Sequence, residues 1–211
     1  MVPNDLAQIL AHRLVPVVVI DDAEKALPLA DALVDSGLPV AEVTFRTAAA
    51  EAAIRSLAAR NDILVGAGTV TSSALAERAV AAGARFVVTP GFSAAVVERC
   101  HVLGVPVIPG VATATEVMAA LEHGFELLKF FPAEAAGGIP LLRALAGPFP
   151  RVRFVPTGGI SAENAVAYLA LPSVAAIGGS WMVAPDLLAA GDFEEIARRT
   201  KEAVALVEGR G

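Results

Sequence analysis

The chain has 211 residues, of which 55% are hydrophobic and 18% are charged, and its formal net charge is −6. This length allows one large domain with a substantial core, and the acidic balance argues against nucleic acid as the main partner. Pro, Gly and charged residues interrupt each apolar run before it reaches the length of a membrane span, so no membrane association is expected.

The N-terminal residues and the cysteine content predict a cytoplasmic location. The first five residues, Met1 to Asp5, lack the basic region that opens a secretory signal. Cys100 is the only cysteine, which excludes a disulfide framework within the chain.

The chain alternates short apolar runs with Ala-, Leu- and Glu-rich segments of helical periodicity. Residues 3–14 predict a short amphipathic helix, with Leu6, Ile9, Leu10 and Leu14 at helical spacing. Eight apolar runs follow, and each precedes turn-forming residues and a helical pattern. The predicted strands cover residues 15–20, 40–45, 63–65, 86–89, 106–108, 126–131, 153–155 and 174–177.

Eight strand–helix units without a break in composition predict an α/β protein with parallel strands joined by right-handed crossovers. We expect a single (β/α)8 TIM barrel with a short N-terminal helix, formed as one domain by residues 1–211. An open α/β sheet is the structural alternative. The even spacing of the eight strand–helix units favours a closed barrel over an open sheet.

Lys129 is the most unusual residue of the chain. It is one of only three lysines, and it lies inside the apolar run Glu126–Phe131, where period-2 alternation puts it on the same face as Leu127 and Phe131. It is either a lysine that reaches into water from the strand end or a desolvated amine that acts as a nucleophile.

Glu42 is the counterpart of Lys129 in the second predicted strand. It alternates with Thr44 and Arg46 on one face, and a carboxylate inside a parallel strand needs a cation or hydrogen-bond donors. Lys129 is the natural candidate, because no other lysine lies in a predicted strand. The two residues predict either a structural ion pair or an amine and a base that share one cavity.

Glycine pairs follow the last two predicted strands. Thr157, Gly158 and Gly159 follow the seventh strand, and Gly179 and Ser180 follow the eighth. Backbone N–H groups at such loops bind anions, and these loops of TIM barrels commonly hold phosphate. The two glycine loops, one after each of the last two strands, together predict a phosphate-binding site.

No metal site is predicted. The three histidines, His12, His101 and His123, are scattered and have no paired ligand spacing. Thr113 to Glu116 match a capping box that opens a helix, so Glu116 is expected to be structural.

Four motifs in one order resemble a known family. They are Glu42-Val43-Thr44-Phe45-Arg46-Thr47, Gly66-Ala67-Gly68-Thr69-Val70, Lys129-Phe130-Phe131-Pro132-Ala133-Glu134 and Pro156-Thr157-Gly158-Gly159-Ile160. With Gly178-Gly179-Ser180-Trp181, the chain resembles class I 2-keto-3-deoxy-6-phosphogluconate aldolases, which are often bifunctional with 4-hydroxy-2-oxoglutarate aldolase. The resemblance covers nearly the whole chain.

The resemblance implies a role for each residue at these positions. Lys129 would form an imine with the substrate ketone, and Glu42 would be the general acid and base. The remaining positions would bind the 2-keto acid phosphate: Arg46 and Thr69 at the pyruvate carboxylate, Pro90 and Phe131 as walls, and Thr157, Gly158, Gly159, Gly179 and Ser180 at the phosphate. The resemblance also implies a homotrimer and no cofactor, since the iminium is the electron sink. Some relatives have a basic residue after the first strand, where this chain has Ile20-Asp21-Asp22.

Two other functions share the phosphate loops. One is another phosphate-binding barrel enzyme, such as a thiamine-phosphate-synthase-like transferase or a sugar-phosphate epimerase. The other is a non-catalytic barrel that binds phosphosugars. Neither requires both Glu42 and Lys129.

Overall fold

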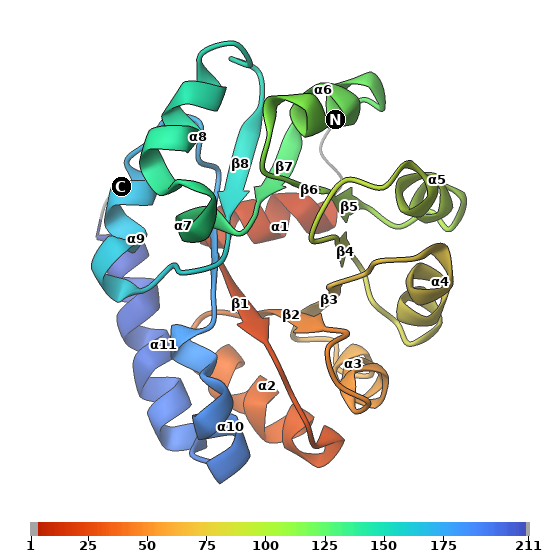
Figure 1. The fold of residues 1–211 in the computed structure, drawn as a ribbon. Coiled ribbons are helices and arrows are strands. Elements are labelled where there is room, and N and C mark those ends of the chain that lie inside the picture. The colour runs from red at the N-terminus through yellow and green to blue at the C-terminus, as the bar shows by residue number, and fades with distance from the viewer. Residues whose placement is uncertain (1–3, 210–211) are drawn as a thin grey trace.

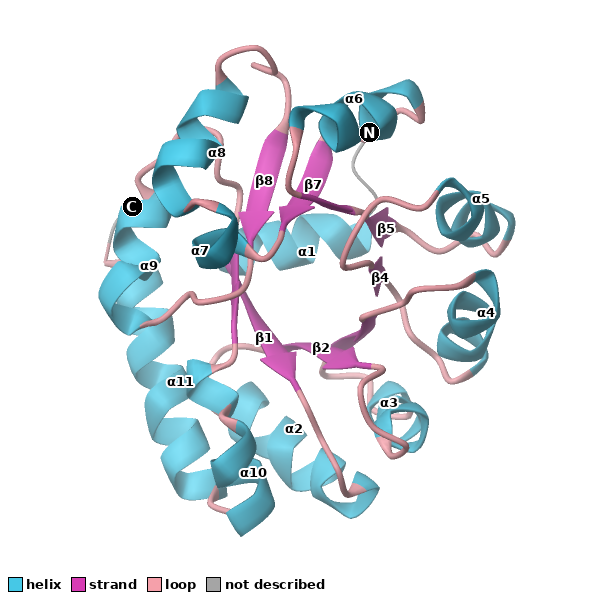
Figure 2. Ribbon diagram, in the orientation of Figure 1, coloured by secondary structure: helices cyan, strands magenta, loops and turns pink. Residues whose placement is uncertain are grey.

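The computed structural model describes residues 4–209. Parallel strands curl around a common centre and helices cover the outside (Figure 1), which confirms the predicted α/β class. Figure 2 shows the strands as an inner layer and the helices as an outer one. The strand segments are β1 (Leu14–Val18), β2 (Val40–Thr44), β3 (Leu64–Gly68), β4 (Val87–Val88), β5 (Val107–Ile108), β6 (Gly110–Val111), β7 (Leu127–Phe130), β8 (Arg153–Pro156) and β9 (Ile177–Gly179).

The helices follow the strands in alternation. They are α1 (Asn4–His12), η1 (Ala23–Lys25), α2 (Ala26–Val34), α3 (Ala50–Ala58), α4 (Ser73–Ala81), α5 (Ala94–Val102), α6 (Ala114–Glu122), α7 (Ala133–Ala136), α8 (Gly138–Ala146), α9 (Ala162–Leu169), η2 (Trp181–Val183), α10 (Pro185–Ala190) and α11 (Phe193–Glu208). Side-chain caps fix several starts: the expected capping box of Thr113 and Glu116 opens α6, and Ser72 caps α4. Such caps are worth about 1 kcal/mol each.

The strands form two parallel sheets. One has the order β5-β4-β3-β2-β1-β9 and the other the order β6-β7-β8. β5 lies within the predicted fifth strand, residues 106–108, and β6 continues the same run beyond its predicted end, after Pro109, which has no N–H to donate to a ladder. Two isolated parallel bridges, between Phe154 and Val174 and between Thr157 and Gly178, connect β8 and its end to β9 and the residues just before it.

The core has two parts because each strand carries apolar residues on both faces. The larger part packs the strands against the outer helices. The smaller part lies among the strands and includes Val40, Leu64, Phe86 and Ile108. Leu6 and Ile9 of α1 join this inner cluster, so α1 covers the N-terminal ends of the strands and leaves the opposite ends for chemistry.

Several predicted element boundaries shift, among them those of α1, β3 and β9. The expected helix 3–14 ends at His12, so Leu14 opens β1 instead, and residue 3 lies outside the described residues. β3 extends to Gly68, beyond its predicted end at residue 65. β9 lies at Ile177–Gly179, beyond the predicted strand 174–177. In both cases glycines occupy the part of the strand that was not predicted. Among residues 4–209, no helix combines the length and hydropathy that a bilayer crossing needs.

Candidate active site

Lys129 and Glu42 meet on the inner side of the curled strands. Lys129 lies in β7 and Glu42 in β2, and both are nearly enclosed, with 6% and 3% of their surface exposed. The Lys129 Nζ donates a hydrogen bond to Glu42 Oε1 at 3.1 Å. The alternation of side chains along each strand therefore points both groups into one space, as the sequence predicted.

The missing side chain of Gly68 makes room for the Glu42 carboxylate. Gly68 lies in β3, the neighbour of β2, and a Cβ built there would lie 2.2 Å from Glu42 Oε1. An alanine at this position would overlap the carboxylate. The glycine therefore determines where the Glu42 carboxylate lies relative to Lys129.

The environment of the pair is apolar on one side. The Phe131 ring centroid lies 5.2 Å from Lys129 Nζ, a distance typical of a cation–π contact. The attraction between two buried charges offsets the free energy of removing them from water only if the two groups are in close contact. Loss of one partner leaves the other charge buried and unpaired. The pair also places a proton acceptor within hydrogen-bond reach of the amine.

Arg46 and Thr69 follow two neighbouring strands. Thr44 and Gly68, the last residues of β2 and β3, are paired, and the Phe45 N–H donates to the Gly68 carbonyl at 2.9 Å. Thr69 has a φ of +58°. A β-branched residue in this region is strained by about 1–3 kcal/mol, and such strain is concentrated at functional sites. Arg46 is exposed in the turn after β2.

Pro90 packs beside the strand next to Lys129. Gly110 of β6 pairs with Lys129, and a Cβ built on Gly110 would lie 2.4 Å from the Pro90 carbonyl carbon. The half-buried Pro90 thus lies against β6, the strand beside the lysine, and the half-buried Phe131 follows β7, the strand that carries it.

The two glycine loops lie side by side. The bridge between Thr157 and Gly178 joins their starting points, and a Cβ on Gly178 would lie 2.4 Å from Thr157 Oγ1. Gly158 and Gly159 have φ values of +97° and +79°, and helix α9 begins just beyond them. Backbone N–H groups and a helix N-terminus at this edge favour an anion.

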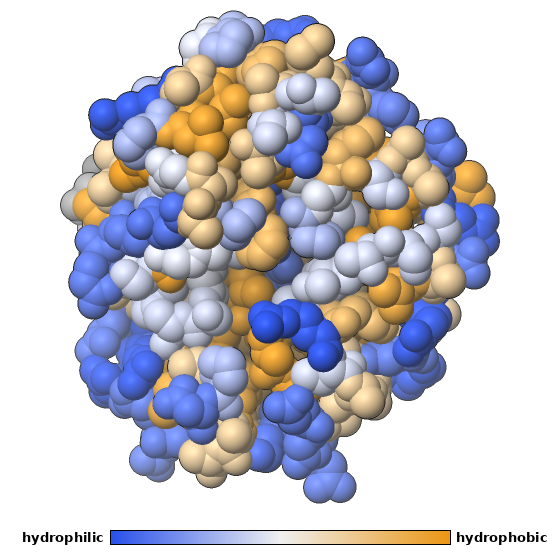
Figure 3. Space-filling model, in the orientation of Figure 1, coloured by the Kyte–Doolittle hydropathy of each residue, from blue (hydrophilic) through white to orange (hydrophobic). Residues whose placement is uncertain are grey.

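Gly179 and Ser180 complete this edge from the other loop. Gly179 is buried and Ser180 is exposed. Figure 3 shows apolar residues near the centre of the face that carries the loops, with hydrophilic residues predominating around its edge. The sequence-predicted residues therefore gather at one end of the strands, with the amine and carboxylate inside and the two loops at the rim.

Glu134 and Tyr168 belong to this region, although no role was predicted for them from the sequence. The Glu134 N–H donates to the Gly158 carbonyl at 3.1 Å, and the Ala133 N–H donates to the Thr157 carbonyl at 2.8 Å. The buried Tyr168 hydroxyl donates to Glu134 Oε1. Burial, and then the neighbouring Glu134 carboxylate, raise the pKa of Tyr168 well above its usual value. These contacts fix the loop after β7 against the loop after β8. The motif around Lys129 contains Glu134, but Tyr168 looks like ordinary helix core in sequence.

Within residues 4–209, no group of three or more His, Cys, Asp and Glu side chains is placed to hold a metal ion. His12, His101 and His123 lie on separate helices or helix ends.

Comparisons with known proteins agree with this geometry. The protein-family model described as KDPG and KHG aldolase matches residues 6–199. A 2-dehydro-3-deoxy-phosphogluconate aldolase of Treponema pallidum is 50% identical over 198 residues, which cover 92% of this chain and 93% of that protein.

Two solved structures are similar over almost the whole fold. The KDPG aldolase of Legionella pneumophila, with pyruvate captured as a covalent carbinolamine intermediate, has a TM-score of 0.91 at 43% identity, covering 94% of this chain and 97% of that one. The 2-keto-3-deoxy-6-phosphogluconate aldolase of Zymomonas mobilis with 3-phosphoglycerate has a TM-score of 0.90 at 40% identity, covering 96% of each chain.

Proposed function

Because the chain belongs to the KDPG and KHG aldolase family, we propose that it is a class I aldolase. The reaction is the reversible cleavage of 2-keto-3-deoxy-6-phosphogluconate to pyruvate and glyceraldehyde 3-phosphate. The observation that carries the proposal is the enclosed contact between Lys129 Nζ and Glu42 Oε1 at 3.1 Å. An amine held this way is suited to imine formation.

Lys129 supplies the nucleophile. Attack on the substrate ketone requires a neutral amine. The Glu42 carboxylate accepts the proton that Lys129 gives up. The first adduct is a carbinolamine, and loss of water, with a proton from Glu42, gives the protonated imine. The cationic imine nitrogen then draws the electron pair of the C3–C4 bond as the bond breaks.

Glu42 moves protons in the later steps as well. It takes the proton of the C4 hydroxyl while the aldehyde leaves, and it returns a proton to the enamine carbon. Hydrolysis of the pyruvyl imine then releases pyruvate and restores the amine. One carboxylate can serve each step because the steps are sequential and occur in one cavity.

The other candidate residues bind the two ends of the substrate. Arg46 and Thr69 bind the pyruvate carboxylate, supported by their place after the strand of Glu42 and its neighbour. Pro90 and Phe131 border the lysine. The phosphate is bound by Thr157, Gly158, Gly159, Gly179 and Ser180, supported by the adjacency of the two loops.

Cleavage of 4-hydroxy-2-oxoglutarate to pyruvate and glyoxylate is a second activity of the same pair. This substrate has the same 2-keto acid end but no phosphate, so it uses Lys129 and Glu42 without the glycine loops. A transferase, an epimerase or a non-catalytic phosphosugar-binding barrel would leave the buried lysine without a chemical role.

We also propose a closed (β/α)8 barrel formed by the whole chain as a single domain. The support is that β5 and β6 are pieces of one strand, which links the two sheets on one side, while the bridge between Thr157 and Gly178 links them on the other. A homotrimer is supported by the exposed apolar side chains of Val102 and Met118. A cytoplasmic location suits the single free thiol of Cys100.

Pyruvate release, followed with lactate dehydrogenase, tests the function. The protein should release pyruvate from 2-keto-3-deoxy-6-phosphogluconate, and Lys129→Met and Glu42→Gln should abolish turnover. Lys201→Met, which alters an exposed lysine on α11, is the matched control and should retain it. Phosphate-dependent stabilisation without pyruvate release would instead support a binding barrel.

A further inference from the structure

The loop after β9 takes its shape from Trp181. The indole ring occupies the space beside Gly179, where a built Cβ would lie 1.9 Å from the ring. Ser180 lies between these two residues, so its backbone follows the position of the tryptophan. Any group that fixes Trp181 therefore also fixes Gly179 and Ser180.

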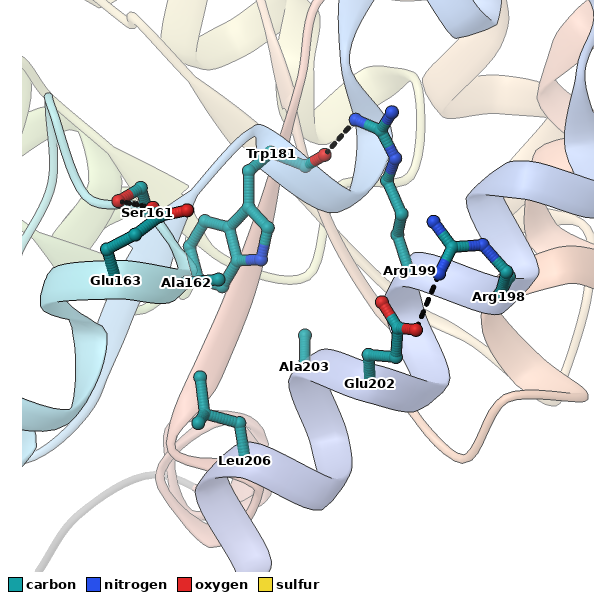
Figure 4. A pocket seen from close by; sticks show the side chains of 9 residues that line it. All are labelled: Ser161, Ala162, Glu163, Trp181, Arg198, Arg199, Glu202, Ala203 and Leu206. Atoms are coloured by element: carbon teal, nitrogen blue, oxygen red, sulfur yellow. Dashed lines mark hydrogen bonds and ion pairs between the residues drawn. The ribbon is translucent and has the colours of Figure 1, made fainter.

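Arg199 of α11 reaches this loop. Its Nη1 donates a hydrogen bond to the Trp181 carbonyl at 3.3 Å, and Figure 4 shows the guanidinium extended from the helix toward that oxygen. The Arg199 Nε donates to Glu195 Oε1 at 2.7 Å. The arginine thus connects the loop after β9 to the last helix of the fold.

Glu195 is the partner of Arg199 within α11. Its N–H donates to Asp192 Oδ1 at 3.1 Å at the start of α11. Hydrogen bonds from Arg198 and then Arg199 lower the pKa of Glu195 to about 2, so it is ionised at neutral pH. Glu195, which accepts from Nε, and the Trp181 carbonyl, which accepts from Nη1, therefore both orient the Arg199 guanidinium.

Packing alone does not restrain the indole on its outer side. A cavity of about 410 Å³ lies between the start of α9 and helix α11, with Trp181 as one wall and Ala162, Ala203 and Leu206 among the others (Figure 4). The indole ring borders this open space on one side. The bond to its carbonyl is a specific restraint on the loop.

We propose that Arg199 is a positioning residue for phosphate recognition. It holds Trp181, and through it Gly179 and Ser180, in the conformation that presents the loop to the phosphate of the substrate. This inference rests on the proposed aldolase function. It makes Arg199 a determinant of the preference for phosphorylated over unphosphorylated 2-keto acids. Arg199 bonds to the loop after β9 and to Glu195, whereas the catalytic pair lies on β7 and β2, so a change at Arg199 should affect phosphate binding and not the chemical step.

The kinetic test uses Arg199→Met, which keeps the aliphatic stem and removes the donors. Arg198→Met is the matched control, because it removes an arginine from the same helix, with its contacts to Glu195 and Glu202, while the Arg199 hydrogen bonds to Glu195 and to the Trp181 carbonyl remain. Loss of one hydrogen bond should raise the KM for 2-keto-3-deoxy-6-phosphogluconate by about tenfold in Arg199→Met, with kcat unchanged. Both constants for 4-hydroxy-2-oxoglutarate should stay at wild-type values, and Arg198→Met should match wild type on both substrates.

Trp181 provides a second readout, since it is the only tryptophan of the chain. Titration with inorganic phosphate should change its fluorescence, and the dissociation constant should be about tenfold higher in Arg199→Met but not in Arg198→Met. Equal losses on both substrates, no loss on either, or the same loss in Arg198→Met would overturn the proposal. If the wild-type protein cleaves neither substrate, the aldolase function fails, and the phosphate titration alone decides the role of Arg199.

Discussion

Replacement of Gly68 by alanine adds one methyl group against the Glu42 carboxylate. The added Cβ would lie 2.2 Å from Glu42 Oε1, 2.8 Å from its Cγ and 2.9 Å from its Cδ, whereas ordinary contact begins at 3.4 Å. The carboxylate must therefore retreat by roughly 1 Å, which lengthens its contact with Lys129. A displacement of this size costs on the order of 100-fold in rate, and overpacking of a core costs about 1–3 kcal/mol of stability.

The assay is kcat/KM for pyruvate release, measured together with urea unfolding. Gly68→Ala should fold with reduced stability and lose about two orders of magnitude in kcat/KM. The matched control is Gly147→Ala, where the added Cβ has an ordinary contact of 3.6 Å with the Ala144 carbonyl and the backbone φ of −59° suits alanine. Wild-type kcat/KM in Gly68→Ala would refute the reasoning, because the position of Glu42 would then not limit the reaction.

Three further predictions concern groups that are buried or partly buried. Lys129→Met should lower the free energy of unfolding by about 3–5 kcal/mol, because Glu42 stays buried without its partner, and the double variant Lys129→Met/Glu42→Leu should recover most of this loss in urea unfolding; a double variant no more stable than the single one would contradict this. Burial raises the pKa of the Cys100 thiol to about 11, so it should not react with a thiol reagent at neutral pH until the protein is unfolded, and rapid labelling of the folded protein would contradict the expectation. Burial lowers the pKa of His12 below its usual 6.5, partly opposed by Glu208, so the folded protein binds this proton less readily than the unfolded chain does. Stability should therefore fall as the pH drops below about 6.5, and His12→Gln should reduce that slope in thermal unfolding; an unchanged slope would contradict it.

The class of the fold was predictable because its signals are local. Apolar runs alternate with helical patterns, and β2 begins at Val40 as predicted. The strand ends were less predictable where glycines occur. Glycine weakens a strand in general, so the pattern predicted ends too early for β3 and β9. Gly68 and Gly178 lie in these strands because the side chains of Glu42 and Thr157 fill the space beside them. That requirement is tertiary and leaves no trace in periodicity.

The centre of the site was predictable from two anomalies, a lysine and a glutamate in apolar strands. Period-2 alternation put each on a defined face, and the structure brings them together. Arg199 and Tyr168 were not predictable, because each looks like an ordinary residue of an amphipathic helix. Their importance comes from one contact each with a distant loop, to Trp181 and to Glu134.

The central claim is that Lys129 is the amine that holds a 2-keto acid covalently. Incubation of the folded protein with pyruvate and borohydride, followed by peptide mass spectrometry, tests it most directly. The expected result is one reduced pyruvyl group on the peptide that contains Lys129, with Lys25 and Lys201 unmodified and no adduct when pyruvate is omitted. A folded protein that gains no adduct at Lys129, or gains it only at Lys25 or Lys201, would contradict the account.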